Sequence, residues 1–214
     1  MNISRVKERS TVTGVPDMHV TEETLEILKF LDDAELDVRN ILDIGCGSGQ
    51  ISLHLARQGY NVTALDKEGP LMEVIDKNLS VTDQIDLTVP VTEESDMTVV
   101  RMRFEEYEGE EAFDAVCCFS MLHYCKTIDD VLFCLAKIQT MIKEKGILLL
   151  SWLTYDTLNR KDVLFPSQDE VFNYLKSQGW VNKKFWNKNI THSHGGLSEH
   201  SHVVVYSVWQ NGAN

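Results

Sequence analysis

The stretch ILDIGCGSGQ, Ile41 to Gln50, places three glycines at alternate positions directly after an apolar segment that ends in an acid and an isoleucine. The segment NILDI predicts a short buried strand, and GQISLHLARQGY predicts a helix that ends at Gly59. Glycines between a strand and a helix let the backbone pass close under a ligand. Gly45, Gly47 and Gly49 hold the first, third and fifth positions of this turn. The turns that bind dinucleotides have their glycines at the first, third and sixth positions instead.

Two acids near the glycines indicate the charge and the chemistry of the ligand. Asp43 precedes Gly45 by two residues, and a carboxylate at this place would repel a phosphate but favours a ligand with an ammonium and a sulfonium. Asp66 ends the next predicted strand, NVTALD, where an acid can accept hydrogen bonds from both hydroxyls of a ribose. The alternative is a glycine-rich turn without a ligand, and the position of Asp66 argues against it.

Predicted helices and strands alternate along the rest of the chain. The hydrophobic patterns predict helices over 21–36, 49–60, 69–79, 128–146 (with a stop at Gly146) and 167–179, and strands over 40–44, 61–66, 97–104, 113–120, 147–154, 180–190 and 201–210. The segment 81–96 receives no assignment. This alternation predicts an α/β fold with a doubly wound parallel sheet, which binds ligands at the carboxyl ends of its strands. The loop between the last two strands is too short for a crossover helix, so these strands should form an antiparallel hairpin.

Length and composition limit the domain organisation and the partners. We expect one domain over residues 1–214, in which 1–37 form an N-terminal arm and a helix that covers the cleft, and 38–214 form the sheet core. The net charge of −13 disfavours nucleic acid and anionic membrane surfaces as partners. We therefore expect a small-molecule partner and a monomer or homodimer.

Cysteine usage and the absence of long apolar segments indicate the compartment. The five cysteines are an odd number and lie mostly within or beside apolar segments, so we expect reduced thiols. The start of the sequence has no apolar core of a signal peptide, and no segment has about 18 consecutive apolar residues. We expect a soluble cytoplasmic protein.

Three motifs carry a resemblance to a known family. LDIGCGSGQ, ALD at the end of the second strand and FDAVCCFSMLHY at the fourth resemble the motifs of the class I S-adenosylmethionine-dependent methyltransferases, over about residues 38 to 210. The resemblance implies a Rossmann-like seven-stranded sheet with an antiparallel last strand, S-adenosyl-L-methionine as cofactor, and methyl transfer. Carried over by position, the cofactor-binding residues are Asp43, Gly45, Cys46, Gly47, Gly49, Asp66, Lys67, Phe104 and Phe119.

The sequence departs from this family where the adenine would bind. The family often has an acid after the third strand, whereas Arg103 and Phe104 are the nearest residues here. Phe104 is therefore interpreted either as a side chain that packs against the adenine ring or as a core residue.

The substrate class rests on weaker similarities. GQISLHLARQGYNVTALDK, FPSQDEVFNYLKSQGW and the histidine-rich loop are similar to the tellurite-resistance methyltransferases, which implies a small acceptor such as a thiol, tellurite or selenite. Residues 119–124 read FSMLHY and do not form the motif of an acid or Asn followed by two prolines and an aromatic residue that enzymes methylating exocyclic amines of DNA carry there. The alternative is a cofactor-binding protein of the same fold that acts as a regulator or partner subunit without methyl transfer.

Histidines supply the candidate catalytic and substrate-binding side chains. His123 and Tyr124 follow the fourth strand, where His123 could accept a proton or form part of the cofactor pocket, and His19 precedes the first helix. His54 lies between apolar residues of a predicted helix and is interpreted as structural.

The loop THSHGGLSEHSH, before the last strand, leaves three alternatives open: a substrate pocket, a metal site or solvated surface. Alternation along a strand places the side chains of His200 and His202 on one face. Because no cysteine lies nearby to complete a metal site, we expect these two histidines to line the substrate pocket and expect no metal.

Overall fold

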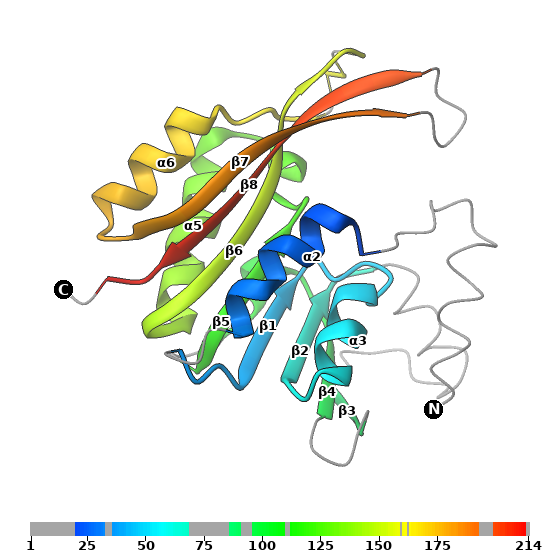
Figure 1. The fold of residues 1–214 in the computed structure, drawn as a ribbon, viewed down its shortest axis with the longest axis vertical. Coiled ribbons are helices and arrows are strands. Elements are labelled where there is room, and N and C mark those ends of the chain that lie inside the picture. The colour runs from blue at the N-terminus through cyan, green and yellow to red at the C-terminus, as the bar shows by residue number, and fades with distance from the viewer. Residues whose placement is uncertain are drawn as a thin grey trace.

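The computed structural model describes residues 20–32, 36–68, 86–90, 96–109, 112–158, 160–161, 163–192 and 199–212. Within these ranges the strands form one sheet in the order β3-β4-β2-β1-β5-β6-β8-β7 (Figure 1). The strands are β1 (Asn40–Ile44), β2 (Asn61–Asp66), β3 (Asp86–Pro90), β4 (Asp96–Arg101), β5 (Phe113–Phe119), β6 (Ile142–Asp156), β7 (Val181–His192) and β8 (His200–Gln210).

The sheet confirms the predicted fold class. Strands β4, β2, β1, β5 and β6 are parallel, and β8 runs antiparallel between β6 and β7. These seven strands form the doubly wound sheet with an antiparallel last strand that the sequence predicted. The edge strand β3 is additional: it pairs antiparallel with β4 and falls in the segment that had no assignment.

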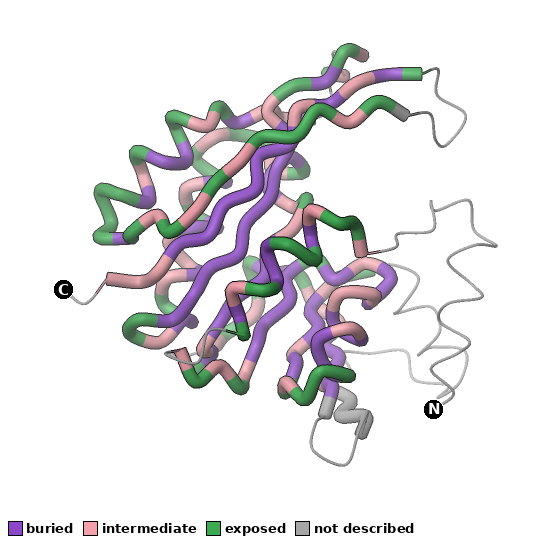
Figure 2. The backbone as a smooth tube through the Cα atoms, in the orientation of Figure 1, coloured by how far each residue is buried: buried purple, intermediate pink, exposed green. Residues whose placement is uncertain are grey.

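Helices cover both faces of the sheet. The helices are α2 (Glu22–Leu28), α3 (Gln50–Arg57), α5 (Ile128–Met141) and α6 (Gln168–Ser177), with 3-10 turns η1 (Lys29–Asp32), η2 (Phe104–Glu106) and η3 (Leu122–Tyr124). Apolar residues of α2 and α3 pack against one face, and those of α5 and α6 pack against the other (Figure 1). Figure 2 shows that the central strands between these layers are buried, as expected for parallel strands covered on both faces.

Side-chain caps explain where two predicted helices begin. The Thr21 hydroxyl accepts a hydrogen bond from the Thr24 backbone N–H at the start of α2. Ser167 and Glu170 form a capping box at the start of α6. Such caps satisfy backbone N–H groups that have no partner within the helix.

The helix predicted over 128–146 is too long. Helix α5 ends at Met141, and β6 begins at the next residue. Gly146 does not stop a helix but lies within β6, where a Cβ atom would be 2.9 Å from the backbone oxygens of both Asp114 and Lys143. Only glycine fits at position 146, because backbone atoms of two other residues approach it closely. The helical pattern did not indicate this contact.

Other expectations concern the cysteines, the membrane and two segments. All five cysteines are free, and four of them are buried. None of the helices in the described ranges is both long and apolar enough to cross a membrane. The predicted helix 69–79 and the candidate residue His19 lie outside the described residues.

Candidate functional site

The glycine turn between β1 and α3 has the backbone conformation for which glycine is favoured. Gly45, Gly47 and Gly49 have φ angles of 71°, 53° and 72°, in the left-handed region. The Gly45 and Cys46 N–H groups both donate to the Leu65 carbonyl, at 2.8 and 3.2 Å, so the turn is fixed against the end of β2. Cys46 is buried there.

Met121 packs against this turn from the segment after β5. A Cβ atom on Gly45 would lie 3.3 Å from the Met121 Cγ atom. The left-handed φ and this contact together explain why a larger residue than glycine is disfavoured at position 45. Sequence reasoning had not singled out Met121, because its proximity to the turn depends on the pairing of β1 with β5.

Asp43 lies next to the turn but is directed into the fold. Its side chain is buried and accepts a hydrogen bond of 2.5 Å from the Ser52 hydroxyl of α3. Burial raises the pKa of Asp43 to about 6, with the Ser52 hydrogen bond opposing this effect and the nearby charge of Asp66 adding to it. The carboxyl is therefore mostly ionised near pH 7.5, although burial disfavours its charge.

Asp66, at the end of β2, is bound to the glycine turn. Its Oδ2 atom accepts a hydrogen bond of 2.9 Å from the Gly47 N–H, and Oδ1 accepts one of 3.3 Å from the Glu68 N–H. A carboxylate has about four lone-pair sites, so this carboxylate can still accept hydrogen bonds from a ligand. The neighbouring Lys67 is exposed and forms an ion pair with Glu68.

The two candidate phenylalanines occupy different environments. Phe104, in η2, is 7% exposed and packs among the apolar residues of the core. The ammonium nitrogen of Lys137 lies 5.5 Å from the centre of its ring, a cation–π distance. This geometry favours the interpretation of Phe104 as a core residue. Phe119, at the end of β5, is partly buried and packs against the core on the other face.

A strained residue connects β5 to the candidate catalytic histidine. Ser120 has a φ angle of 54°, and its N–H donates to the Ser151 carbonyl of β6 at 2.9 Å. Non-glycine residues in this region of backbone space are uncommon and often lie near functional sites. The turn brings η3, with His123 and Tyr124, to the carboxyl edge of the sheet.

His123 and Tyr124 differ in exposure. His123 is 5% exposed, whereas Tyr124 is 74% exposed, and their ring centres are 4.3 Å apart. Burial lowers the pKa of His123 to about 4, and the charges of Arg160 and His202 lower it further. His123 is therefore neutral near pH 7 and is a weaker base than an unperturbed histidine.

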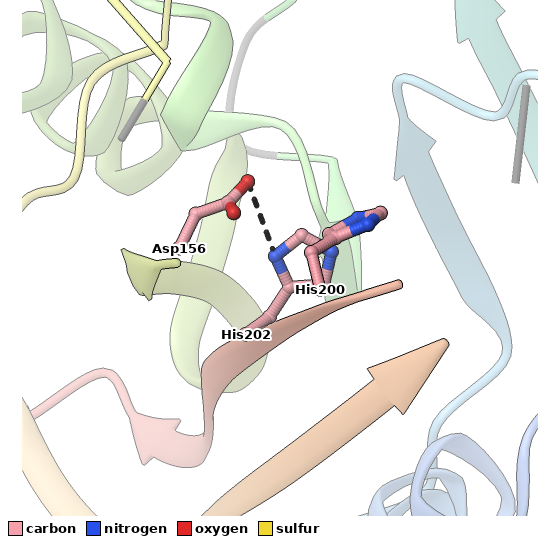
Figure 3. A group of neighbouring side chains, drawn as sticks. All are labelled: Asp156, His200 and His202. Atoms are coloured by element: carbon pink, nitrogen blue, oxygen red, sulfur yellow. Dashed lines mark ion pairs between the residues drawn. The ribbon is translucent and has the colours of Figure 1, made fainter. Parts of the chain in front are cut away.

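The last strand brings two histidines together with an acid that sequence reasoning missed. Asp156 ends β6 and is paired in register with His202 of β8, and both side chains are buried together with His200 (Figure 3). The His202 Nδ1 atom lies 3.4 Å from the Asp156 Oδ2 atom. The rings of His200 and His202 have centres 4.6 Å apart and planes at 84°, which confirms that the two side chains share one face.

Two donors from the segment after β6 hold the Asp156 carboxylate. The Leu158 N–H donates to Oδ1 at 2.8 Å, and the Arg160 Nε–H donates to Oδ2 at 3.1 Å. Burial raises the pKa of Asp156, but the Leu158 hydrogen bond and the charges of His202 and Arg160 outweigh it and lower the pKa overall. His192 pairs with His200 in the register of β7 and β8, and His194 lies outside the described residues.

Sequence comparisons match this chain to methyltransferases. A family model described as a methyltransferase domain matches residues 42–150. A putative methyltransferase of Geobacillus sp. (strain WCH70) is 25% identical over 142 residues, which cover 65% of this chain and 53% of that protein. The ubiquinone biosynthesis O-methyltransferase of Rickettsia bellii (strain OSU 85-389) is 27% identical over 143 residues, covering 67% and 51%. This chain thus matches about half the length of these curated relatives.

Solved structures share the fold at low sequence identity. The N-methyltransferase NodS of Bradyrhizobium japonicum WM9, in complex with S-adenosyl-L-homocysteine, has a TM-score of 0.64 and 13% identity, with 98% of both chains covered. The magnesium protoporphyrin IX methyltransferase of Synechocystis PCC 6803, with bound S-adenosylmethionine, has a TM-score of 0.54 and 15% identity, covering 97% of this chain and 84% of the other. At such identities the likeness concerns the fold alone.

Proposed function

Because this chain belongs to the methyltransferase domain family, we propose that it transfers a methyl group from S-adenosyl-L-methionine to a small molecule. Its sheet is that of the class I S-adenosylmethionine-dependent methyltransferases. Two of the similar solved structures hold this cofactor or its demethylated product.

The glycine turn and Asp66 are the observation that carries the proposal. The left-handed glycines keep side chains away from the carboxyl end of β1, and the Gly47 N–H holds the Asp66 carboxylate beside the turn. A cofactor that lies over Gly45, Cys46 and Gly47 would present its ribose hydroxyls to Asp66. The ammonium of its methionine part would lie near the charge of Asp43, which suits a cationic ligand better than a phosphate.

Other predicted contacts have less support. Lys67 is exposed and paired with Glu68, and Phe104 is buried beside Lys137. Phe119, which ends β5 beside β1, supports the proposal better because the carboxyl ends of these strands meet at the same edge.

Methyl transfer from a sulfonium requires alignment of the nucleophile and exclusion of water more than it requires a strong base. Neutral His123 and the partly exposed edge around Tyr124 suit a role in positioning an acceptor. His200 and His202 add two buried imidazoles on β8. We propose a soft acceptor such as a thiol, tellurite or selenite, since imidazoles can donate to or accept from such groups.

The test is methyl transfer from labelled S-adenosyl-L-methionine to a panel of acceptors. The panel contains thiols, tellurite, selenite and, because the curated relatives include O-methyltransferases, phenols. Transfer to a thiol or a chalcogen oxyanion, with formation of S-adenosyl-L-homocysteine, would support the proposal. Transfer to phenols alone would contradict the proposed acceptor class.

Calorimetry on the same preparation addresses the alternative function, a cofactor-binding regulator or partner subunit. S-adenosyl-L-homocysteine should bind and raise the melting temperature of the protein through linkage. Binding without transfer to any acceptor would favour the regulator. Absence of binding would refute both functions.

A further inference from the structure

We propose that Asp156, His200 and His202 form a binding site for a divalent transition-metal ion, with zinc as the best match. The three residues come from the carboxyl end of β6 and the start of β8 (Figure 3). Their ligand atoms lie within 4.8 Å of one another, and all three side chains are buried. The proposed site lies outside the glycine turn and does not depend on methyl transfer.

Strand pairing creates the site. In the antiparallel register of β6 and β8, Asp156 stands directly opposite His202, so their side chains leave the sheet on the same face. His200 precedes His202 by two residues and shares that face. The pairing continues past the strand end, because the Thr157 N–H donates to the Ser201 carbonyl at 3.0 Å and the Ser201 N–H donates to the Thr157 hydroxyl at 2.9 Å. The three ligand residues therefore lie on two strands that are held together by hydrogen bonds.

The separation of Asp156 and His202 is that of an ion pair and also fits two ligands of one metal ion. The Nδ1 to Oδ2 distance is 3.4 Å, whereas a charge-assisted hydrogen bond between such atoms is about 2.7–2.9 Å long. Two ligand atoms that each lie about 2.0–2.1 Å from one ion at a tetrahedral angle are about 3.3–3.4 Å apart. The observed distance is compatible with two ligands of one ion, and atoms of the group that are up to 4.8 Å apart would move closer to bind it together.

The surroundings of the acid resemble the second layer of a metal site. Carboxylates that bind metal are themselves hydrogen-bonded, which fixes their orientation. Here the Leu158 N–H and the Arg160 Nε–H hold the two oxygens of Asp156. The charge of Arg160 opposes a cation nearby, so we expect weaker binding than at a structural zinc site with four protein ligands.

The ligand set determines the class of metal. Two imidazoles and one carboxylate suit zinc, iron, nickel or copper rather than magnesium or calcium, which prefer oxygen ligands. Three protein ligands leave at least one position open, as in catalytic zinc sites. If the protein acts as proposed above, this open position is available to the thiol or oxyanion acceptor.

The sequence alone had favoured the absence of a metal, since no cysteine near the histidines completed a ligand set. Asp156 completes it from a position 44 residues before His200 in the chain. A contact of this kind follows from strand register and not from the spacing of residues in a motif.

The experiment is titration of the chelator-treated full chain with zinc chloride, followed by calorimetry. We expect one equivalent to bind and to raise the melting temperature. Cobalt(II) should give visible absorption bands of a site with nitrogen ligands. Asp156→Asn, His200→Gln and His202→Gln should each weaken zinc binding at least tenfold, and the folding of each variant is checked by circular dichroism.

Two matched controls separate this site from other histidines. The double variant His192→Gln/His194→Gln removes the other histidines of the loop, and His54→Gln removes one on α3; both should bind zinc as the wild type does. The proposal would be overturned if the His192→Gln/His194→Gln variant lost as much zinc affinity as the ligand variants do. It would also be overturned if folded wild-type protein bound no zinc. Calorimetry with S-adenosyl-L-homocysteine on all variants shows separately whether the cofactor site is intact, so failure of the metal proposal and failure of the proposed function remain distinguishable.

Discussion

The glycine turn and the histidine cluster, which consists of Asp156, His200 and His202, lie at the same edge of the sheet but arise in different ways. The turn, with Asp43 and Asp66, is contained in one β-α-β unit between Ile41 and Asp66. The histidine cluster joins the end of β6 to the start of β8, with α6 and β7 between them in the chain. In the first region backbone conformation creates the site, whereas in the second the register of two strands brings side chains together.

The two regions also treat a buried acid differently. Within the described part of the chain, Asp43 has a neutral donor, Ser52, and its pKa is raised to about 6, chiefly by burial. Asp156 has a backbone N–H and a guanidinium as donors, and its pKa is lowered although burial opposes this. Asp43 is thus held at a cost to stability, whereas Asp156 is stabilised by its neighbours.

The largest expected effect concerns Asp66 beside the glycine turn, where we propose that the cofactor binds. Asp66→Ala should weaken cofactor binding by about 1–3 kcal/mol, because the ribose hydroxyls lose their charged acceptor. Turnover at saturating cofactor should change little. Calorimetry with S-adenosyl-L-homocysteine measures the affinity, and Glu68→Ala, at the exposed neighbour, is the matched control. An unchanged affinity in Asp66→Ala would remove Asp66 from the cofactor site.

The opposite result, a change in turnover without a change in cofactor affinity, is expected for the histidine cluster. Replacing His200 and His202 together by Ala should lower turnover at least tenfold, about 1.4 kcal/mol of transition-state stabilisation, with nearly unchanged cofactor affinity. Steady-state kinetics with the acceptor found in the panel measures this effect, with and without chelator. Unchanged turnover in both conditions would show that the histidines have no part in the reaction.

Two conservative variants should change stability in opposite directions. The pKa of Asp43 is raised in the folded state, so the stability from its neutral form is full below the unfolded pKa, near 4, and is lost as the pH rises through about 6. Asp43→Asn avoids this loss and should be more stable than the wild type by up to about 3 kcal/mol at pH 7.5, with little difference at pH 4.

Asp156 has a lowered pKa, so its contribution is present above the unfolded pKa and is lost as the pH falls through the folded value. Asp156→Asn should therefore destabilise the protein at pH 7.5. Urea unfolding at both pH values measures the free energies of unfolding. If both variants changed the free energy of unfolding in the same direction at pH 7.5, the proposed difference between the two acids would be wrong.

The smallest effect is expected outside both regions. His54 lies on α3, and burial and the charge of Arg57 lower its pKa, so it is neutral near pH 7. His54→Gln should change the free energy of unfolding by less than about 0.5 kcal/mol. A large change in cofactor affinity in this variant would mean that the cofactor site extends onto α3.

Sequence patterns predicted the glycine turn and its flanking strands closely, and the cluster of Asp156, His200 and His202 only in part. Strands β1 and β2 have the predicted bounds, and Asp66 lies beside the glycine turn as expected. The pattern also placed His200 and His202 on one face. The prediction for 128–146 was wrong at its end, since Ile142 of β6 continues the apolar spacing of α5 and the next three residues, Lys143 to Lys145, are good helix formers. Phe104, for which the sequence left two alternatives, is buried among core residues.

The sequence by itself determined the class of fold, the position of the glycine turn and the hairpin at the end, because these depend on residues close together in the chain. The period of a strand decides which side chains share a face. It does not decide which residue of another strand stands opposite, because that register depends on the packing of the whole sheet. Only the tertiary structure therefore placed Met121 against Gly45, and Asp156 opposite His202 with Arg160 behind it.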